Sequence, residues 1–153
     1  MSLKADRIEL LTDVSFFATA TATRGGVASR TAPGGSGVSM DDASAVVSYA
    51  ATASGALPMG VLLNDVVDLD LTRQHINWHK DEVQKGGKVT LLRIGQVTTN
   101  SLVSAIVPGP GSGAYVGANG LIGTASGTDV VQIGTFLSNK DADGYAKVSI
   151  NIL

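Results

Sequence analysis

An internal repeat constrains the fold of this chain more than any other feature of its sequence. The segment TASG occurs at residues 52–55 and again at 124–127, and MGVLLN at 59–64 is matched by IGTFLS at 133–138. Two further pairs of segments keep the same order, namely GSG at 35–37 and 111–113, and KVTL at 88–91 with KVSI at 147–150. The repeat predicts two similar halves, about 33–96 and 109–153, that bury their apolar faces against each other.

The composition favours many short strands joined by tight turns. The chain has 19 glycines and only 5% aromatic residues, and it is rich in alanine, threonine, serine and valine. Small and β-branched residues suit strands, and glycine suits turns. We therefore expect a mainly β fold, a compact barrel or sandwich. Charged residues make up only 16% of the chain, so we also expect part of its surface to be covered in an assembly.

The 153 residues suit one β domain, at 25–153, that follows an N-terminal arm and first strand at 1–24. Within the arm, residues 2–12 fit either a short helix or a strand. Alternating alanine and threonine at 18–23 predicts the first strand, and the glycine-rich segment 24–39 predicts a flexible loop. Further strands are predicted at 45–51, 59–63, around 75–78, 88–96, 102–107, 114–116, 120–122, 129–137 and 145–152.

Charge and cysteine content argue against several classes of function. The formal net charge is -2 and the 11 basic residues are scattered, so no positive stripe is present to bind DNA or RNA. The chain has no cysteine, which leaves neither disulfides nor thiolate metal sites. No segment is apolar for long enough to span a membrane, and charged residues near the start interrupt the core that a signal peptide needs. We expect a cytoplasmic product that binds neither nucleic acid nor membrane.

One glycine motif has the spacing of a dinucleotide fingerprint. Gly109, Gly111 and Ala114 follow an apolar segment, as the glycines of a pyrophosphate-binding turn do. The fingerprint requires a helix after the turn, and Pro108 and Pro110 together with further glycines leave no such helix. The motif therefore favours a flexible turn.

Two segments could in principle hold a metal ion. His75 and His79 would share one face of a helix as zinc ligands do, but a polar row on a strand is favoured because no third ligand can be assigned. The run NKDADG at 139–144 has the oxygen spacing of a calcium loop. Ile150 stands where the closing glutamate belongs, which favours a hairpin turn on Asp143 and Gly144. We expect no metal and no other cofactor.

Nothing in the sequence requires an enzyme. The chain has neither the nucleophile elbow of a serine hydrolase nor the lysine-containing loop that binds nucleotide phosphates. Spacing alone neither supports nor rejects a serine triad built on one of the two histidines. We expect no catalytic activity.

Three segments carry a resemblance to a known family. The apolar strand and turn at 45–55, followed by LPMGVLL at 57–63, resemble the hallmark stretch of lambda-type phage head-decoration proteins. VQIGTFL at 131–137 and DGYAKV at 143–148 resemble a small β module of phage capsid accessory proteins. Together the resemblance covers roughly residues 33–153.

The resemblance implies a capsid decoration, or cement, protein. Such proteins bind the major capsid protein as homotrimers on the outer surface of the expanded head and stiffen it against internal DNA pressure. This implies a place in the virion, reached from the host cytoplasm during assembly. The N-terminal segment of the family typically becomes ordered on the capsid and adds to its sheet by backbone hydrogen bonding. The candidates for capsid contact here are Phe16, Phe17, Thr19, Thr21 and Thr23.

Two other functions compete with the decoration role. One is a head-fibre or receptor-binding β module, which would bind bacterial surface glycans. The other is a small hydrolase, which would depend on His75 or His79. For Phe16 and Phe17 there is also a purely structural interpretation, in which one fills the domain core and the other is partly exposed.

Overall fold

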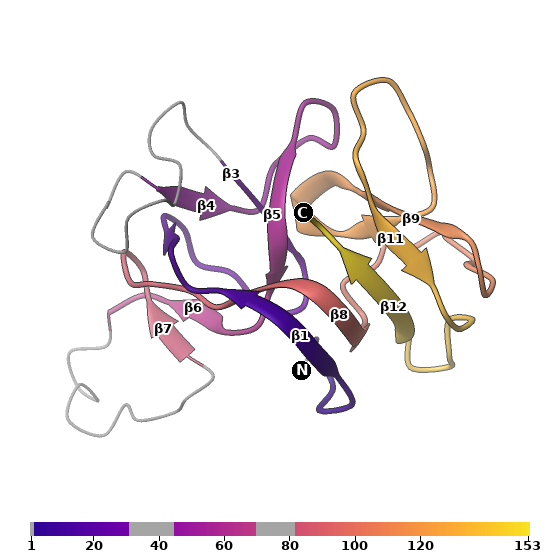
Figure 1. Ribbon diagram of the computed structural model, residues 1–153, viewed down its shortest axis with the longest axis horizontal. Helices are drawn as coiled ribbons and strands as arrows, with labels where there is room; N and C mark the ends of the chain where they lie inside the picture. The colour runs from indigo at the N-terminus through magenta and orange to yellow at the C-terminus, as the bar shows by residue number, and fades with distance from the viewer. Residues whose placement is uncertain (1, 31–44, 70–81) are drawn as a thin grey trace.

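The fold of the chain is mainly β, as the composition predicts. A computed structural model describes residues 2–30, 45–69 and 82–153. Its elements are β1 (Ile8–Asp13), β2 (Phe17–Ala18), β3 (Val27–Arg30), β4 (Val46–Ser48), β5 (Leu57–Leu62), β6 (Asp65–Val67), β7 (Glu82–Gln84), β8 (Leu91–Thr99), β9 (Gly113–Val116), the 3-10 turn η1 (Ala118–Gly120), β10 (Ile122–Gly123), β11 (Gln132–Phe136) and β12 (Ala146–Asn151). Figure 1 shows their arrangement.

Ten of these strands form one mixed sheet. Its order is β10-β9-β11-β12-β8-β5-β3-β4-β2, with β1 added to β8, while β6 and β7 form a separate parallel pair. The other neighbours are antiparallel, except that β2 and β4 run parallel. The two ends of the order, β10 and β2, are not paired with each other. The described strands therefore form no closed barrel, and of the two predicted shapes the barrel is not found.

β8 is the central strand of the sheet. Along its length, one edge pairs with β1, and the opposite edge pairs first with β5 and then with β12. Gly95 lies where β1 and β12 flank β8 on both sides, opposite Glu9 and Ile150. An ideal Cβ at Gly95 would lie 2.0 Å from the carbonyl oxygen of Ile8. Glycine therefore permits the close approach of β1 to β8.

The order of the strands repeats along the chain. In the first set of strands, β3 pairs with β4 and β5, and β5 pairs with β8. In the second set, β9 pairs in the same way with β10 and β11, and β11 pairs with β12. All these pairs are antiparallel, and the last strands of the two sets, β8 and β12, pair with each other. The strand order therefore recurs along the chain, although the first set includes β3, which lies before the predicted start of the first half at about residue 33.

The apolar side chains gather in two clusters. The larger cluster lies under the C-terminal strands and includes Ile133, Phe136 and Val148, whereas the smaller one lies under the N-terminal segment and includes Phe16 and Val89. β5 and the beginning of β8 lie between the clusters and contribute to both. For example, Leu91 belongs to the smaller cluster and its neighbour Leu92 to the larger. In β12 the alternation of buried and partly exposed residues is the pattern of a strand with one apolar face.

Four predicted segments differ in the structure. In the strand predicted at 120–122, Gly120 belongs to the turn η1 and only Ile122 lies in a strand, β10. Residues 102–107 form no strand, because only Leu102 makes a bridge, to Ile122, before the chain turns. Part of the predicted loop 24–39 is the strand β3, whose first three residues are buried between β4 and β5. The alanine and threonine run is a regular strand only at its beginning, in β2, and then makes a single bridge from Ala22 to Val66.

Candidate binding surfaces

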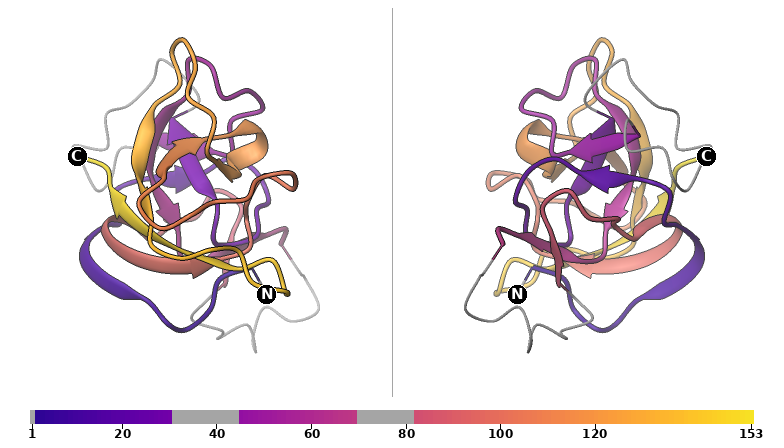
Figure 2. Two further views of the ribbon diagram at one scale, coloured as in Figure 1. Left: turned by 90° about the vertical axis from the view of Figure 1, so that its right-hand side faces the viewer. Right: turned by 90° about the vertical axis from the view of Figure 1, so that its left-hand side faces the viewer.

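The N-terminal strand β1 is the most exposed element of the sheet. Its first five residues are exposed and its last is half-buried, and they include Ile8 and Leu11 together with Leu10, which is 73% exposed. Just beyond the strand, Val14 is exposed as well. Figures 1 and 2 show β1 on the outer side of β8. β1 pairs with β8 alone among the described strands, so its other edge is open to a further strand.

The charged groups of the arm are paired within the chain. Arg7 lies 2.6 Å from Glu9, Lys147 lies 3.6 Å from Asp6, and Arg93 lies 3.4 Å from Asp13. An exposed pair such as that of Lys147 and Asp6 contributes little to stability, whereas the pair of Arg93 and Asp13 is more buried. All three pairs neutralise charges next to the strand. The exposed apolar side chains therefore dominate the chemistry of the β1 surface, defined here as Ile8, Leu10, Leu11 and Val14 with the open edge of β1.

Asp13, at the end of β1, is hydrogen-bonded to Ser15 and Arg93, and these bonds predict that the stability of the fold depends on pH. Partial burial raises the pKa of Asp13, but hydrogen bonds donated by the amide and hydroxyl of Ser15 and by Arg93 outweigh it and hold this pKa below its usual range. The ionised Asp13 carboxylate therefore stabilises the folded protein fully above the unfolded pKa of about 3.9, and this contribution is lost as pH falls through the lower pKa of the folded state.

We expect Asp13→Asn to lower the urea midpoint at pH 7. The difference from the parent should shrink below about pH 3, and an equal difference at both pH values would contradict this role.

The sequence-predicted contact residues lie on the segment that follows β1. Phe16 is buried in the smaller apolar cluster, whereas Phe17 is half-buried. Thr19, Thr21 and Thr23 are exposed. The five residues therefore do not form one surface, since one of them is core and the others line two separate hollows.

Phe17 and Thr19 line the first hollow. It has a volume of about 420 Å³ and is also lined by Val46 and Lys85. The ammonium of Lys88 lies 5.1 Å from the centre of the Phe17 ring, within the range of a cation–π contact. This Nζ atom is buried and makes no hydrogen bond within the described part of the chain. The ring of Phe17 therefore contacts the Lys88 ammonium and also lines the hollow.

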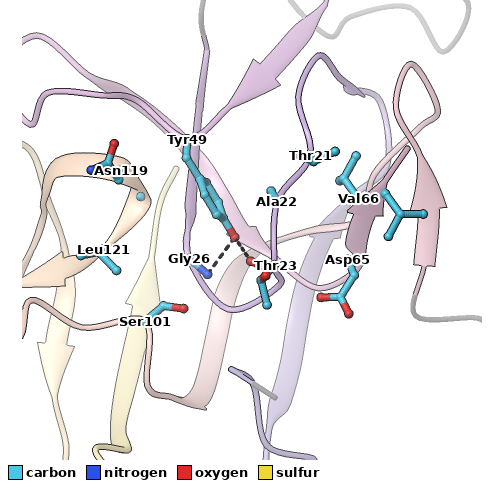
Figure 3. A pocket seen from close by; sticks show the side chains of 12 residues that line it. Thr21, Ala22, Thr23, Gly26, Tyr49, Asp65, Val66, Ser101, Asn119 and Leu121 are labelled. Atoms are coloured by element: carbon cyan, nitrogen blue, oxygen red, sulfur yellow. Dashed lines mark hydrogen bonds between the residues drawn. The ribbon is translucent and has the colours of Figure 1, made fainter. Parts of the chain in front are cut away.

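Thr21 and Thr23 line a larger hollow, which we call the Tyr49 pocket (Figure 3). Its volume is about 540 Å³, within the usual range of small-molecule sites. The pocket is formed by the segment after β2, the chain after β4, β6, and the region of η1. Its remaining lining residues are Ala22, Gly26, Tyr49, Asp65, Val66, Val67, Ser101, Asn119, Gly120 and Leu121.

Tyr49 is a fixed wall of this pocket. Its hydroxyl donates a hydrogen bond to the carbonyl oxygen of Thr23 and accepts one from the amide of Gly26 at 3.2 Å. Burial raises the pKa of Tyr49 far above its usual range, and the negative charge of Asp65 raises this pKa further. The hydrogen bond from the Gly26 amide lowers the pKa, but by less than burial raises it. Tyr49 therefore stays protonated at neutral pH and lines the pocket as a neutral side chain held by its two hydrogen bonds.

The motifs that suggested cofactors take other forms. The segment after Gly109 and Gly111 is the strand β9, so no helix follows the glycines and the fingerprint is a turn. In the turn at 139–144, the Asp141 carboxylate accepts hydrogen bonds from the amides of Asp143 and Tyr145 at 3.0 and 2.8 Å. These bonds hold the pKa of Asp141 below its usual range. His75 and His79 lie outside the described residues.

Residues 2–30, 45–69 and 82–153 contain no group of three or more acidic, histidine or cysteine side chains placed to bind a metal ion. They also contain no helix long and apolar enough to cross a membrane. Comparison of the chain with protein-family models and with curated proteins finds no match.

Sequence patterns gave no indication of the Tyr49 pocket or of the exposure of β1. Tyr49, Asp65 and Asn119 come from three distant segments and share no motif. For β1, the alternation of Ile8 and Leu10 is a strand signal, but it does not tell which face is exposed.

Proposed function

We propose that this chain is a structural decoration protein of a tailed phage. In this proposal it binds the major capsid protein on the outer surface of the expanded head, as a homotrimer, and stiffens the shell without catalysing a reaction. It would act in the virion after assembly in the host cytoplasm. The proposal joins the sequence resemblance to one structural observation, the β1 surface.

The β1 surface carries the proposal. A strand that exposes apolar side chains and an open edge is an aggregation hazard unless another protein covers it. Backbone groups on such an edge can pair with a strand of a partner, and side chains such as Leu10 and Ile8 then lose their contact with water. A capsid surface is a partner that would cover this strand permanently.

The resembling segments support the framework of the fold rather than the contact itself. Residues 57–63 include β5, residues 131–137 include β11, and residues 143–148 include the first half of β12. These strands carry buried residues of the larger cluster, such as Val61, Phe136 and Val148. In this proposal the resembling segments build the domain and the arm supplies the capsid contact.

The arm also suggests how binding proceeds. Leu3 is buried and bridges Thr99, and β1 is paired with β8. The arm is therefore already ordered in the single chain, and the capsid would add a strand to the outer edge of β1. Pre-ordering reduces the entropy that binding must overcome.

The substitution Leu10→Asp tests the proposed contact. A charge on the open face of β1 should lower the affinity for expanded capsids at least tenfold, because the carboxylate loses its hydration when the strand is covered. The folded protein should be as stable as the parent, since Leu10 is 73% exposed. Co-sedimentation with expanded capsids measures the affinity, and thermal unfolding measures the stability.

Val107 provides the matched control. It is apolar and 92% exposed, and it lies in the loop between β8 and β9. Val107→Asp should leave capsid binding unchanged. If Leu10→Asp binds as well as the parent, or if both variants lose binding equally, the β1 surface is not the capsid contact.

A further inference from the structure

The lining of the Tyr49 pocket combines several hydrogen-bonding groups with apolar side chains. Hydroxyl groups come from Thr21, Thr23 and Ser101, an amide from Asn119 and a carboxylate from Asp65. Val66 and Leu121 add apolar surface, and Figure 3 shows these side chains around the wall formed by Tyr49. The pocket can therefore form many directional hydrogen bonds while also contacting C–H groups.

The positions of these groups are fixed by the fold. Gly120 has a φ of 73°, and an ideal Cβ there would lie 2.6 Å from the Tyr49 ring, so the backbone packs directly against the ring. Asn119 has a φ of 57°, a conformation that asparagine adopts more readily than most residues, and its backbone N–H donates a hydrogen bond to the carbonyl oxygen of Ala50 at 2.7 Å. The Asp65 carboxylate accepts the amide of Arg24 at 2.8 Å. A ligand would meet donors and acceptors that are already placed.

The charge of the lining narrows the class of ligand. Among the described residues that line the pocket none is basic, and Asp65 is acidic, so a phosphate or carboxylate ligand would be repelled. One carboxylate is too few for a tightly bound metal ion. The mixture of hydroxyl, amide and carboxylate groups is too polar for a purely apolar ligand.

We propose that the Tyr49 pocket binds a neutral saccharide. Sugar hydroxyls both donate and accept hydrogen bonds, so they match the carboxylate of Asp65 and the hydroxyls of Thr23 and Ser101. The C–H groups of a pyranose ring match Val66 and Leu121. The assignment goes beyond the decoration role and does not rest on it, because β1 contributes no residue to the pocket. A decoration protein with such a pocket would present a carbohydrate-binding site on the head of the phage.

Titration of the ¹⁵N-labelled protein with defined sugars tests this site. The probes are glucose, galactose, mannose, rhamnose and N-acetylglucosamine, with glucose 6-phosphate as the charged comparison. We expect at least one neutral sugar to shift the amide signals of Gly26, Asn119 and Gly120 saturably, and glucose 6-phosphate to bind more weakly than glucose. If no sugar shifts these signals saturably, or if the phosphorylated sugar binds more tightly, the proposal is wrong.

Matched variants locate the binding within the pocket. Asp65→Asn keeps an oxygen for the Arg24 amide and Thr23→Val keeps the shape of the side chain, and each should weaken sugar binding about tenfold or more. Thr135→Val on β11 lies outside the pocket and should change nothing. Equal losses in all three variants would contradict the assignment.

The same variants separate this proposal from the decoration role. Asp65→Asn should bind expanded capsids like the parent, and Leu10→Asp should bind the sugar like the parent. Loss of sugar binding in Leu10→Asp would contradict a site confined to the Tyr49 pocket.

Discussion

Replacing Gly134 with alanine is expected to cause the largest loss of stability of any single methyl added at a described glycine. An ideal Cβ at Gly134 would lie 1.8 Å from the carbonyl oxygen of Ser149, on the neighbouring strand β12. The two strands must then move apart, which breaks ladder hydrogen bonds beside the larger apolar cluster. We expect the free energy of unfolding to fall by about 3 kcal/mol or more, measured by urea denaturation.

Gly109→Ala is the matched control. Gly109 does not have a positive φ, and the nearest atom to its ideal Cβ is the Ser112 hydroxyl at 3.8 Å. This variant should be within about 0.5 kcal/mol of the parent. If Gly134→Ala is equally stable, the close packing of β11 on β12 is not as the structure describes it.

Replacing Phe16 with alanine is expected to cause the second large effect. Phe16 is 2% exposed and packs in the smaller apolar cluster, which joins the N-terminal segment to β5 and β8. Removing a buried phenylalanine leaves a cavity and typically costs about 3–5 kcal/mol. The loss should appear as a lower midpoint of urea or thermal unfolding.

Its neighbour Phe17 should behave differently. The Phe17 ring is half-buried and lines a surface hollow, so Phe17→Ala should cost only about 1 kcal/mol. If Phe17 also contacts the capsid, this variant should bind expanded capsids more weakly at nearly unchanged stability. Equal losses of stability in the two variants would mean that both rings belong to the core.

Much of the C-terminal half could be predicted from the sequence. Residues 145–152 alternate between apolar and polar, and β12 has the same alternation of buried and half-buried residues. The glycine run after Pro108 predicts a turn, and a turn precedes β9. In both places local chemistry and tertiary packing favour the same conformation.

Other strands could not be predicted because distant partners stabilise them. β3 follows Gly25 and Gly26, which indicate a loop, yet it lies between β4 and β5 in the sheet and its first three residues are buried. In the opposite sense, residues 102–107 are apolar enough for a strand, but the neighbouring chain offers only one bridge. Strand formation depends on the availability of a partner edge, which a local pattern does not reveal.

The repeated strand order gives the internal repeat a structural interpretation. Gly60 and Gly134 occupy matching places in the repeat, and both lie in the third strand of their set against the fourth. An ideal Cβ at Gly60 would lie 2.8 Å from both Leu91 Cβ and the carbonyl oxygen of Leu92. Close approach of the third and fourth strands thus requires glycine in both halves, which is one reason for the repeat to keep it.

Light scattering on the purified protein, alone and mixed with expanded or unexpanded capsids of its source phage, tests the central claim most directly. We expect a trimer, or a monomer that joins only the expanded capsid, and we expect Leu10→Asp to lower the affinity for the expanded capsid at least tenfold. A monomer that ignores both forms of the capsid would contradict the decoration role.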